Sequence, residues 1–344
     1  MKSSTKRARR WRLHAAVLAA AVAIGLAPTL GADEAQADPV LPYLDQSLPF
    51  NVRAADLVSR MTQEEKASQF FTGMFMAPYQ APAIERLGVH SYNYWNEALH
   101  GVARVGAATE FPTGQGIAST WDRDLVHAMT TAISDEARAK TNDCLNAPGA
   151  TISTWCMGAT YWSPTINLAR DPRWGRADES YGEDPFLAGE LAGQFAQGLQ
   201  GNRNTSLPDS VGGTTDSYLK AVSTPKHYLA NNSEVNRHSG TSNLTDRSLH
   251  EYYTAQFGIA VEDYGAKGLM TSYNSVNVDP NYTAVAAQPT IKAELSYQDV
   301  AGTPGTPVPA NKYAVETLMR RVYGFDGYVT SDCGAVQDTW EVYP

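Results

Sequence analysis

Several strand-like segments of this sequence end in side chains that could do chemistry. Residues 325–330 combine aromatic and β-branched side chains, which is typical of a buried strand, and Ser331 and Asp332 follow them before Gly334. A carboxylate at the carboxyl end of a strand is where α/β sheets place catalytic groups. The alternative is that Asp332 only caps the helix that follows.

Other strand-like segments end in the same way. They span residues 88–95, 159–168, 218–224 and 266–273. The polar residues at or after their ends are, in order, Glu97, Arg176, Lys226 with His227, and Tyr273. Because the carboxyl ends of parallel strands meet at one face, this repetition predicts a single site there.

The elements that must position these residues alternate along the chain. Helices are predicted over 51–69, 121–140, 185–200, 245–264 and 315–323. Strands that alternate with helices indicate an α/β fold built from βα units around a parallel sheet. Residues 201–217 and 276–311 are predicted to be long loops.

Composition narrows the class of ligand. The chain has 344 residues, with 43% hydrophobic and 18% charged side chains, as expected for a globular protein with a substantial core. A net charge of -9 disfavours a nucleic-acid partner. The 18 Tyr and 7 Trp suit sugars, because aromatic faces stack on apolar surfaces while polar tips form hydrogen bonds.

The N-terminus resembles a secretory signal peptide. Basic residues 6–10 precede an apolar stretch at 15–27, and Ala35-Gln36-Ala37 has the pattern of a cleavage site. We therefore expect residues 1–37 to be removed and the protein to be secreted, without stable insertion in a membrane. An uncleaved membrane anchor is the alternative, and the choice between general and twin-arginine export stays open.

The cysteines indicate no metal site. Cys144 and Cys156 could pair in an oxidising compartment, which leaves Cys333 beside Asp332. The sequence has no CxxC motif and no His/Cys cluster, so we expect neither a metal nor another cofactor.

Motifs at these strand ends resemble glycoside hydrolase family 3. They are Arg170–Arg176 with Glu179–Pro185, Pro225–Asn232, Met270–Asn274 and Val329–Gly334. The similarity runs from about residue 51 to residue 337, and motifs in the right order are more specific than any one motif alone. It implies a (β/α)8 TIM-like barrel over residues 38–344.

The segment 94–102 is most like the β-xylosidase and α-arabinofuranosidase branch. The β-glucosidases of the family usually carry Asp where Glu97 stands and Trp where Cys333 stands. A longer acid leaves less room beside the sugar, which would favour a pentose. The resemblance thus implies hydrolysis of terminal non-reducing β-D-xylosides; a β-glucosidase of the same family is the alternative.

The resemblance also implies a role for each residue. Asp332 would be the nucleophile of a retaining, double-displacement mechanism, kept ionised by nearby cations. Lys226 and Arg176 would bind sugar hydroxyls, His227 would donate to a hydroxyl, and Glu97 would accept from a vicinal diol. Tyr273 would orient the nucleophile.

Lys226 and His227 pose a geometric problem, because neighbours in a regular strand point to opposite faces. We therefore predict irregular backbone at this strand end. The structural alternative applies to other motif residues: an ion-pair network is expected among Arg170, Arg173, Glu179, Glu183 and Asp184. Trp95 and Trp174 could be pocket walls or core, and His100 and His238 are expected to be structural or exposed.

Members of the family continue well beyond the point where this sequence stops. They complete the barrel and add an α/β sandwich domain, which usually carries the acid/base Glu. We therefore expect an incomplete barrel without the second domain and its acid. A truncated, non-catalytic sugar-binding fragment is the alternative to an enzyme. The expected partner is an oligosaccharide or glycoside, and the sequence leaves the oligomeric state open.

Overall fold

The computed structural model describes residues 41–70, 80–146, 158–201, 218–279 and 305–343. The chain divides into two compact units, residues 1–40 and residues 41–344, and only the second contains described residues. The predicted signal peptide therefore lies outside the described residues. Among the helices that the structure describes, none is both long and apolar enough to cross a membrane.

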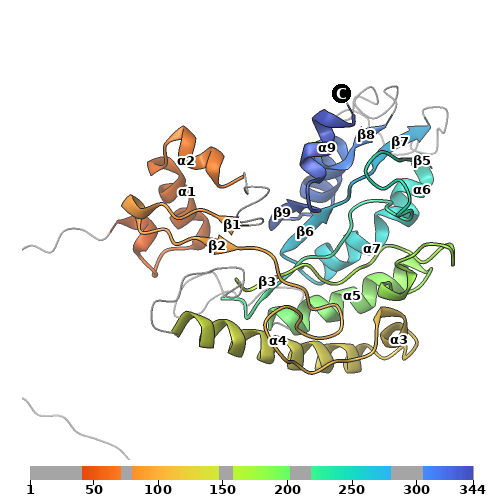
Figure 1. Cartoon of the computed structure of the whole chain (residues 1–344), viewed down its shortest axis with the longest axis horizontal. Helices are drawn as coiled ribbons and strands as arrows, with labels where there is room; N and C mark the ends of the chain where they lie inside the picture. The colour runs from red at the N-terminus through yellow and green to blue at the C-terminus, as the bar shows by residue number, and fades with distance from the viewer. Residues whose placement is uncertain (1–40, 71–79, 147–157, 202–217, 280–304, 344) are drawn as a thin grey trace, which may run out of the picture. The chain divides into compact units, whose positions relative to one another are not determined.

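Short parallel strands form the centre of the fold (Figure 1). β3 (Thr160–Tyr161) pairs with β4 (Val222–Ser223), and β6 (Gly268–Thr271) pairs with β9 (Tyr328–Ser331). An isolated parallel bridge from Thr165 to Lys226 extends the first pairing, and a second from Tyr228 to Thr271 joins the two pairs into one series. Four of the strand-like segments predicted from the sequence thus lie side by side.

The fifth predicted segment borders the same series. β2 (Tyr92–Asn93) pairs antiparallel with β1 (Gln80–Ala81). The carbonyl of Asn93 accepts a hydrogen bond from the amide of Gly158 at 3.0 Å, and that of Asn96 accepts from Trp162 at 2.8 Å. The chain leading to Glu97 therefore runs beside the chain that enters and leaves β3.

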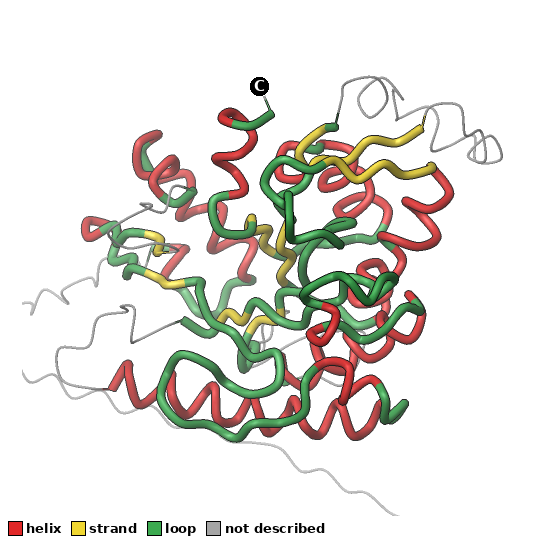
Figure 2. Tube along the Cα trace, turned by 45° about the vertical axis from the view of Figure 1, so that its right-hand side comes forward, coloured by secondary structure: helices red, strands yellow, loops and turns green. Residues whose placement is uncertain are grey.

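Two long helices pack along one flank of the strands. α4 (Arg123–Asn146) and α5 (Pro185–Gln200) lie side by side in Figures 1 and 2. α5 begins where the Asp184 carboxylate accepts from the amide of Leu187, and it ends at Gly201 with φ +81°. This is the cap chemistry expected of Asp and Gly at helix ends.

The remaining helices follow the predicted order. The predicted helix 51–69 is α1 (Phe50–Arg60) and α2 (Gln63–Ser68), separated by the capping box that Thr62 and Glu65 form. The predicted helix 245–264 is a mixed helical run: α6 (Asp246–Ser248), the π-type turns Leu249–Tyr253 and Ile259–Asp263, and α7 (Ala255–Gly258). The π-type helix Tyr313–Val322 covers the predicted helix 315–323. α3 (Gly114–Ala118) and α9 (Ala335–Glu341) lie outside the predicted helical ranges, and short 3-10 helices span Pro42–Leu44, Glu85–Leu87, Ala177–Glu179 and Val308–Ala310.

One small sheet was not predicted. β5 (Thr241–Thr245) pairs in parallel with β7 (Ser275–Asp279), and β7 pairs antiparallel with β8 (Thr306–Pro307). The prediction of a continuous loop over 276–311 is therefore wrong at both ends. Val276 and Val278 alternate with polar residues and are buried, which is the strand pattern that the prediction overlooked.

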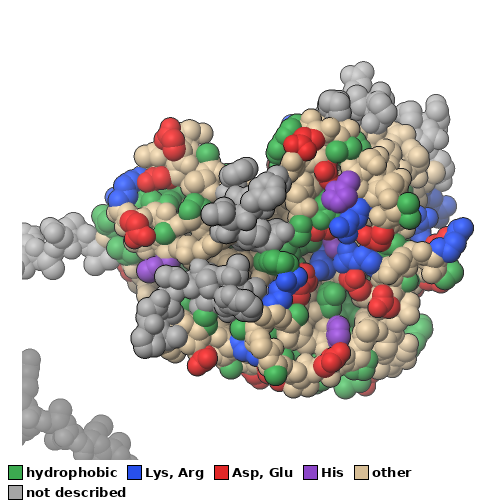
Figure 3. All heavy atoms as spheres, viewed as in Figure 1, with side chains coloured by type: hydrophobic (Ala, Val, Ile, Leu, Met, Phe, Trp, Pro, Cys, Tyr) green, Lys and Arg blue, Asp and Glu red, His purple; other side chains and the backbone are tan. Residues whose placement is uncertain are grey.

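The core lies between the strands and the helices. Leu191, Phe195 and Leu199 of α5 are fully buried beside Ile133 of α4 and Leu269 of β6. Every residue of α5 from Leu191 to Gln200 is buried, so this part of the helix is covered on all its faces. Figure 3 shows Lys, Arg, Asp, Glu and His side chains gathered near the middle of the face that Figure 1 presents.

Candidate active site

Asp332 lies where β9 ends. Its amide donates to the carbonyl of Thr271 at 2.8 Å, which continues the pairing of β6 with β9, and its Oδ1 accepts from the amide of Cys333 at 2.7 Å. α9 begins three residues later, its N-cap residue is Gly334, and no side chain caps it. The interpretation of Asp332 as a helix cap is therefore wrong, and its carboxylate stays available to a ligand.

His227 faces this carboxylate. Nε2 of His227 lies 3.5 Å from Oδ2 of Asp332, and both side chains are largely buried. The predicted irregular backbone is confirmed, because β4 ends at Ser223 and only single bridges hold Lys226 and Tyr228. Both neighbouring side chains, Lys226 and His227, lie next to carboxylates.

Lys226 and Glu97 form a buried ion pair. Nζ of Lys226 lies 2.8 Å from Oε2 of Glu97, and the side chains are 4% and 20% exposed. Glu97 comes from the chain after β2 and Lys226 from the chain after β4, so the pair joins two of the predicted strand ends. A buried ammonium needs such a partner, because water no longer solvates it.

Arg176 pairs with Glu179 within its own loop. Nε of Arg176 lies 2.8 Å from Oε1 of Glu179, whose Oε2 accepts from the hydroxyl of Thr165 at 3.1 Å. Burial alone would lower the pKa of Arg176, but the hydrogen bond and charge of Glu179 outweigh it and raise the pKa. The guanidinium is thus a fixed positive charge near Asp332.

The expected network among the other motif residues is not observed in the described part of the chain. Arg173 forms a bidentate ion pair with Asp171 instead, and Asp184 caps α5. Arg170 lies over the ring of Tyr253, 5.7 Å from its centroid. Of the predicted set, Glu179 contacts a candidate site residue, Arg176.

Tyr273 is buried beside Asp332. Burial and then the charge of the Asp332 carboxylate raise the pKa of the Tyr273 phenol, so the phenol stays protonated. The guanidinium of Arg237 lies 4.7 Å from the centre of its ring, and the ring of His238 lies 4.2 Å away. His238 is half exposed and bonds Asp338 at 2.8 Å, which agrees with a structural role.

The structure adds residues that the sequence analysis missed. Asn167 bonds both the backbone and the ring of His227. Glu234 accepts from Nε1 of Trp174 at 3.0 Å and pairs with Arg237 at 3.2 Å. Asn167 is the polar residue near the end of the strand-like segment 159–168, so the rule that found the other residues could have found it.

The electrostatics of His227 follow from its surroundings. Burial lowers the pKa of His227 well below its usual value, and the positive charges of Arg176, Lys226 and Arg237 lower it further. The imidazole is therefore neutral near pH 7 and carries a single ring proton.

A cavity of about 670 Å³ reaches Asp332. Tyr94, Trp162 and Tyr328 supply aromatic walls, and Val336 lies at the start of α9. Trp95 stacks on Trp162 with ring centres 6.3 Å apart, whereas Trp174 is buried. Of the candidate site residues, Asp332 lines this cavity, whereas Glu97, Arg176, Lys226, His227 and Tyr273 do not. The cavity therefore adjoins the cluster of site residues at Asp332 and is not enclosed by that cluster.

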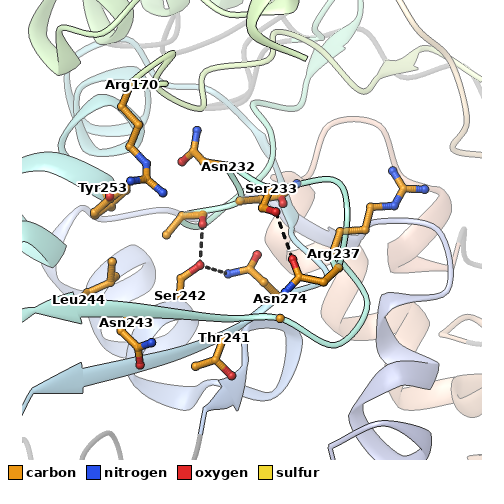
Figure 4. A pocket seen from close by; sticks show the side chains of 14 residues that line it. Arg170, Asn232, Ser233, Arg237, Thr241, Ser242, Asn243, Leu244, Tyr253 and Asn274 are labelled. Atoms are coloured by element: carbon orange, nitrogen blue, oxygen red, sulfur yellow. Dashed lines mark hydrogen bonds between the residues drawn. The ribbon is translucent and has the colours of Figure 1, made fainter. Parts of the chain in front are cut away.

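A second, polar cavity of about 360 Å³ lies beneath the loop after His227 (Figure 4). Arg170, Arg237 and Asn274 are among the residues that line it. The amide of Asn274 donates to Ser242 at 3.0 Å, and Ser242 donates to the carbonyl of Ala230 at 2.8 Å. Since Arg237 also lies over Tyr273, the wall of this cavity supports the carboxylate site.

The structure describes no cluster of three or more His, Cys, Asp and Glu side chains that could hold a metal within its described ranges. Cys333 lies outside any disulfide, and Cys144 is disulfide-bonded. Cys156, its expected partner, lies outside the described residues.

The profile of the glycosyl hydrolase family 3 N-terminal domain matches residues 93–343, and the chain belongs to this family. The α/β, TIM-barrel-like fold expected from the sequence is the fold of this domain. A xylan 1,4-β-xylosidase of Xylanibacter ruminicola is 33% identical over 306 residues, which are 88% of this chain and 30% of that protein. The probable β-D-xylosidase 7 of Arabidopsis thaliana is 34% identical, over 84% of this chain and 33% of that protein.

Solved structures agree with this relationship. The family 3 exo-β-xylosidase XlnD, solved with a xylobiose aziridine activity-based probe, has a TM-score of 0.66 and is 29% identical, over 88% of this chain and 34% of that one. A family 3 β-glucosidase of Bifidobacterium adolescentis has a TM-score of 0.59 and is 25% identical, over 81% of this chain and 32% of that one. The chain spans about a third of the length of these relatives.

Proposed function

We propose that this chain is the nucleophile-bearing domain of a retaining exo-β-xylosidase acting on terminal non-reducing β-D-xylosides. The observation that carries the proposal is the position of Asp332. Its carboxylate lies at the end of β9, caps no helix and faces His227 at 3.5 Å. The phenol of Tyr273 and the guanidinium of Arg176 lie close enough to interact electrostatically with it. The names of the relatives support xylose as the sugar.

In the proposed reaction, each candidate site residue has one role. A carboxylate oxygen of Asp332 attacks the anomeric carbon, and the glycosidic C–O bond breaks as the glycosyl ester forms. The leaving oxygen departs with a proton from a general acid, and water then cleaves the ester. Lys226, Arg176 and Glu97 bind the sugar hydroxyls in this proposal, and the protonated phenol of Tyr273 orients Asp332.

The general acid lies outside the described residues in our proposal. Among the glutamates described near Asp332, Glu97 is paired with Lys226, Glu234 with Arg237 and Glu179 with Arg176. Glu341 accepts from Gln337 at 2.6 Å on α9. None of these carboxyls is uncommitted, which supports an acid supplied by a separate domain, as the greater length of the relatives also suggests.

Turnover of two types of substrate tests whether the general acid is missing from the described residues. General acid assistance contributes roughly 10²–10⁴ in rate, and aryl glycosides with good leaving groups need it least. We expect this chain to turn over activated aryl β-xylosides weakly and xylobiose not at all, with Asp332→Asn abolishing the aryl activity. Rapid cleavage of xylobiose would overturn the placement of the acid, and binding of xylose without any turnover would favour a sugar-binding fragment.

We further propose that residues 1–37 form a signal peptide and that the mature protein is secreted. The basic residues 6–10, the apolar stretch 15–27 and the Ala35–Ala37 site support this proposal. N-terminal sequencing of protein recovered from the culture medium should begin at Asp38. Protein that retains Met1 would contradict the proposal.

A further inference from the structure

The hydrogen bonds between Asn167 and the backbone of His227 fix the orientation of the Asn167 amide. The backbone amide of His227 donates to Oδ1 of Asn167 at 2.8 Å, and Nδ2 of Asn167 donates to the carbonyl of His227 at 2.8 Å. If the oxygen and nitrogen of the side chain were exchanged, the NH₂ group would face the backbone N–H of His227, and the oxygen would face the carbonyl of His227. Neither contact could then be a hydrogen bond. Only one orientation therefore satisfies both contacts.

This orientation decides which ring nitrogen of His227 carries the proton. Nδ1 of His227 lies 2.9 Å from Oδ1 of Asn167, and an amide oxygen can only accept. Nδ1 is therefore the donor. A neutral imidazole has one ring proton, so Nε2 presents an unshared electron pair.

Nε2 is the atom that faces Asp332. It lies 3.5 Å from Oδ2 of the carboxylate, and in this tautomer both atoms are acceptors. The two atoms therefore cannot satisfy each other. A hydroxyl group that enters the site can donate to Nε2 and accept in turn from a cation such as Lys226.

We infer that Asn167 is a positioning residue that holds His227 in its Nδ1-protonated tautomer, so that Nε2 accepts a hydrogen bond from a substrate hydroxyl. The direction of this bond is opposite to the one expected from the sequence, in which His227 donates. The identification of the donor as a sugar hydroxyl rests on the proposed function. That Nδ1 carries a proton rests on the geometry of Asn167, and that Nε2 carries none rests on the neutrality of the buried ring.

The tautomer has a consequence for the nucleophile. A doubly protonated His227 would place a charged donor on Oδ2 of Asp332 and occupy the electron pair that attacks the sugar. A neutral acceptor leaves that pair free. Burial and the charges of Arg176, Lys226 and Arg237 hold the pKa of His227 low, so Asn167 and these cations act in the same direction.

Nitrogen NMR of the full chain labelled with ¹⁵N-histidine reads the tautomer directly. The set of ring nitrogen signals that is lost in His227→Gln belongs to His227. We expect a protonated Nδ1 and an unprotonated Nε2 from pH 6.5 to 8. A ring protonated at Nε2, or an exchanging mixture, would overturn the inference.

The variant Asn167→Asp tests the role of Asn167. His227 should titrate at higher pH in this variant, because a carboxylate stabilises the doubly protonated ring. An unchanged titration would contradict the role of Asn167. If this variant does not fold, the spectrum of the unaltered protein still decides.

Binding of xylose analogues tests the hydroxyl. Fluorine in place of a hydroxyl cannot donate, so one singly fluorinated xylose should bind about tenfold more weakly than xylose. This difference should disappear in His227→Ala. Equal penalties in both proteins for every analogue would overturn the acceptor role. If xylose itself does not bind while NMR shows the expected tautomer, the proposed function is wrong and the role of Asn167 stands.

Discussion

Nζ of Lys226 lies 2.8 Å from Oε2 of Glu97, although 129 residues separate them in the sequence. The contact joins the chain after β2 to the chain after β4 across the carboxyl ends of the strands. It also neutralises a buried ammonium beside His227. The pair therefore links the stability of this face to the sugar binding that we propose for it.

Breaking this pair should destabilise the fold. Lys226→Met leaves the Glu97 carboxylate largely buried and unpaired, and loss of one partner of a buried pair costs roughly 3–5 kcal/mol. We expect the free energy of unfolding to fall by an amount near the lower end of this range, because the Glu97 side chain is still 20% exposed to water. Urea unfolding measures it.

The exposed pair Arg247–Glu251 is the matched control. Its side chains are 62% and 63% exposed, and Arg247→Met should change the unfolding free energy by less than about 0.5 kcal/mol. The double variant Lys226→Met with Glu97→Gln should recover part of the loss. Equal effects of Lys226→Met and Arg247→Met would show that the buried pair is not formed.

The length of Glu97 should set sugar preference. Glu97→Asp withdraws the carboxylate by one methylene and makes room for an exocyclic hydroxymethyl group, a change worth about 10-fold or more in discrimination. We expect the ratio of glucose affinity to xylose affinity to rise in calorimetric titrations. Glu97→Gln keeps the length and should weaken both sugars alike. A ratio that moves equally in both variants would refute the size argument.

Stability should fall in mild acid because of His227. Its pKa is lowered in the folded state and is about 6.5 in the unfolded state, so the unfolded chain takes up this proton first. The stabilisation is complete above pH 6.5. It is lost, by up to about 1.4 kcal/mol per pH unit, as the pH falls from there toward the folded pKa.

Urea unfolding at several pH values from 7.5 to 5 tests this slope. Asp332, Arg176, Lys226 and Arg237 are the charged groups around the ring, and each remains in His227→Gln. The difference between the two proteins therefore isolates His227. Parallel pH profiles would mean that the ring titrates near its usual pKa in the folded protein.

The approach of β6 to β4 should tolerate no side chain at Gly268. A Cβ there would meet the Thr224 hydroxyl and lie 2.8 Å from the carbonyl of Ser223. Gly268→Ala should therefore cost about 1–3 kcal/mol in urea unfolding, as overpacking of a close contact does. Gly175→Ala is the control, since a Cβ there meets nothing within 4 Å. Similar effects of both changes would contradict the close approach.

The sequence predicted the order of elements and the residues that meet, because polar residues followed each buried strand-like segment. It missed β5 and β7, whose short alternating patterns lie in segments rich in Asn, Ser and Thr, and β8, which is two residues long in a segment rich in Gly and Pro. It also missed Asn167, whose importance depends on a contact with His227 sixty positions later. The sequence predicted that the backbone at Lys226 and His227 is irregular. It could not predict where the two side chains point, because hydrophobic periodicity describes only a regular strand.

Trapping of the nucleophile tests the central proposal most directly. A 2-deoxy-2-fluoro β-xyloside with a good leaving group should form a stable glycosyl ester, because the fluorine slows its hydrolysis more than its formation. Mass spectrometry of the digested chain should then show one added fluoroxylosyl group on the peptide that contains Asp332, and none in Asp332→Asn. A label on another carboxylate, with Asp332 unmodified, would contradict the assignment of Asp332 as the nucleophile.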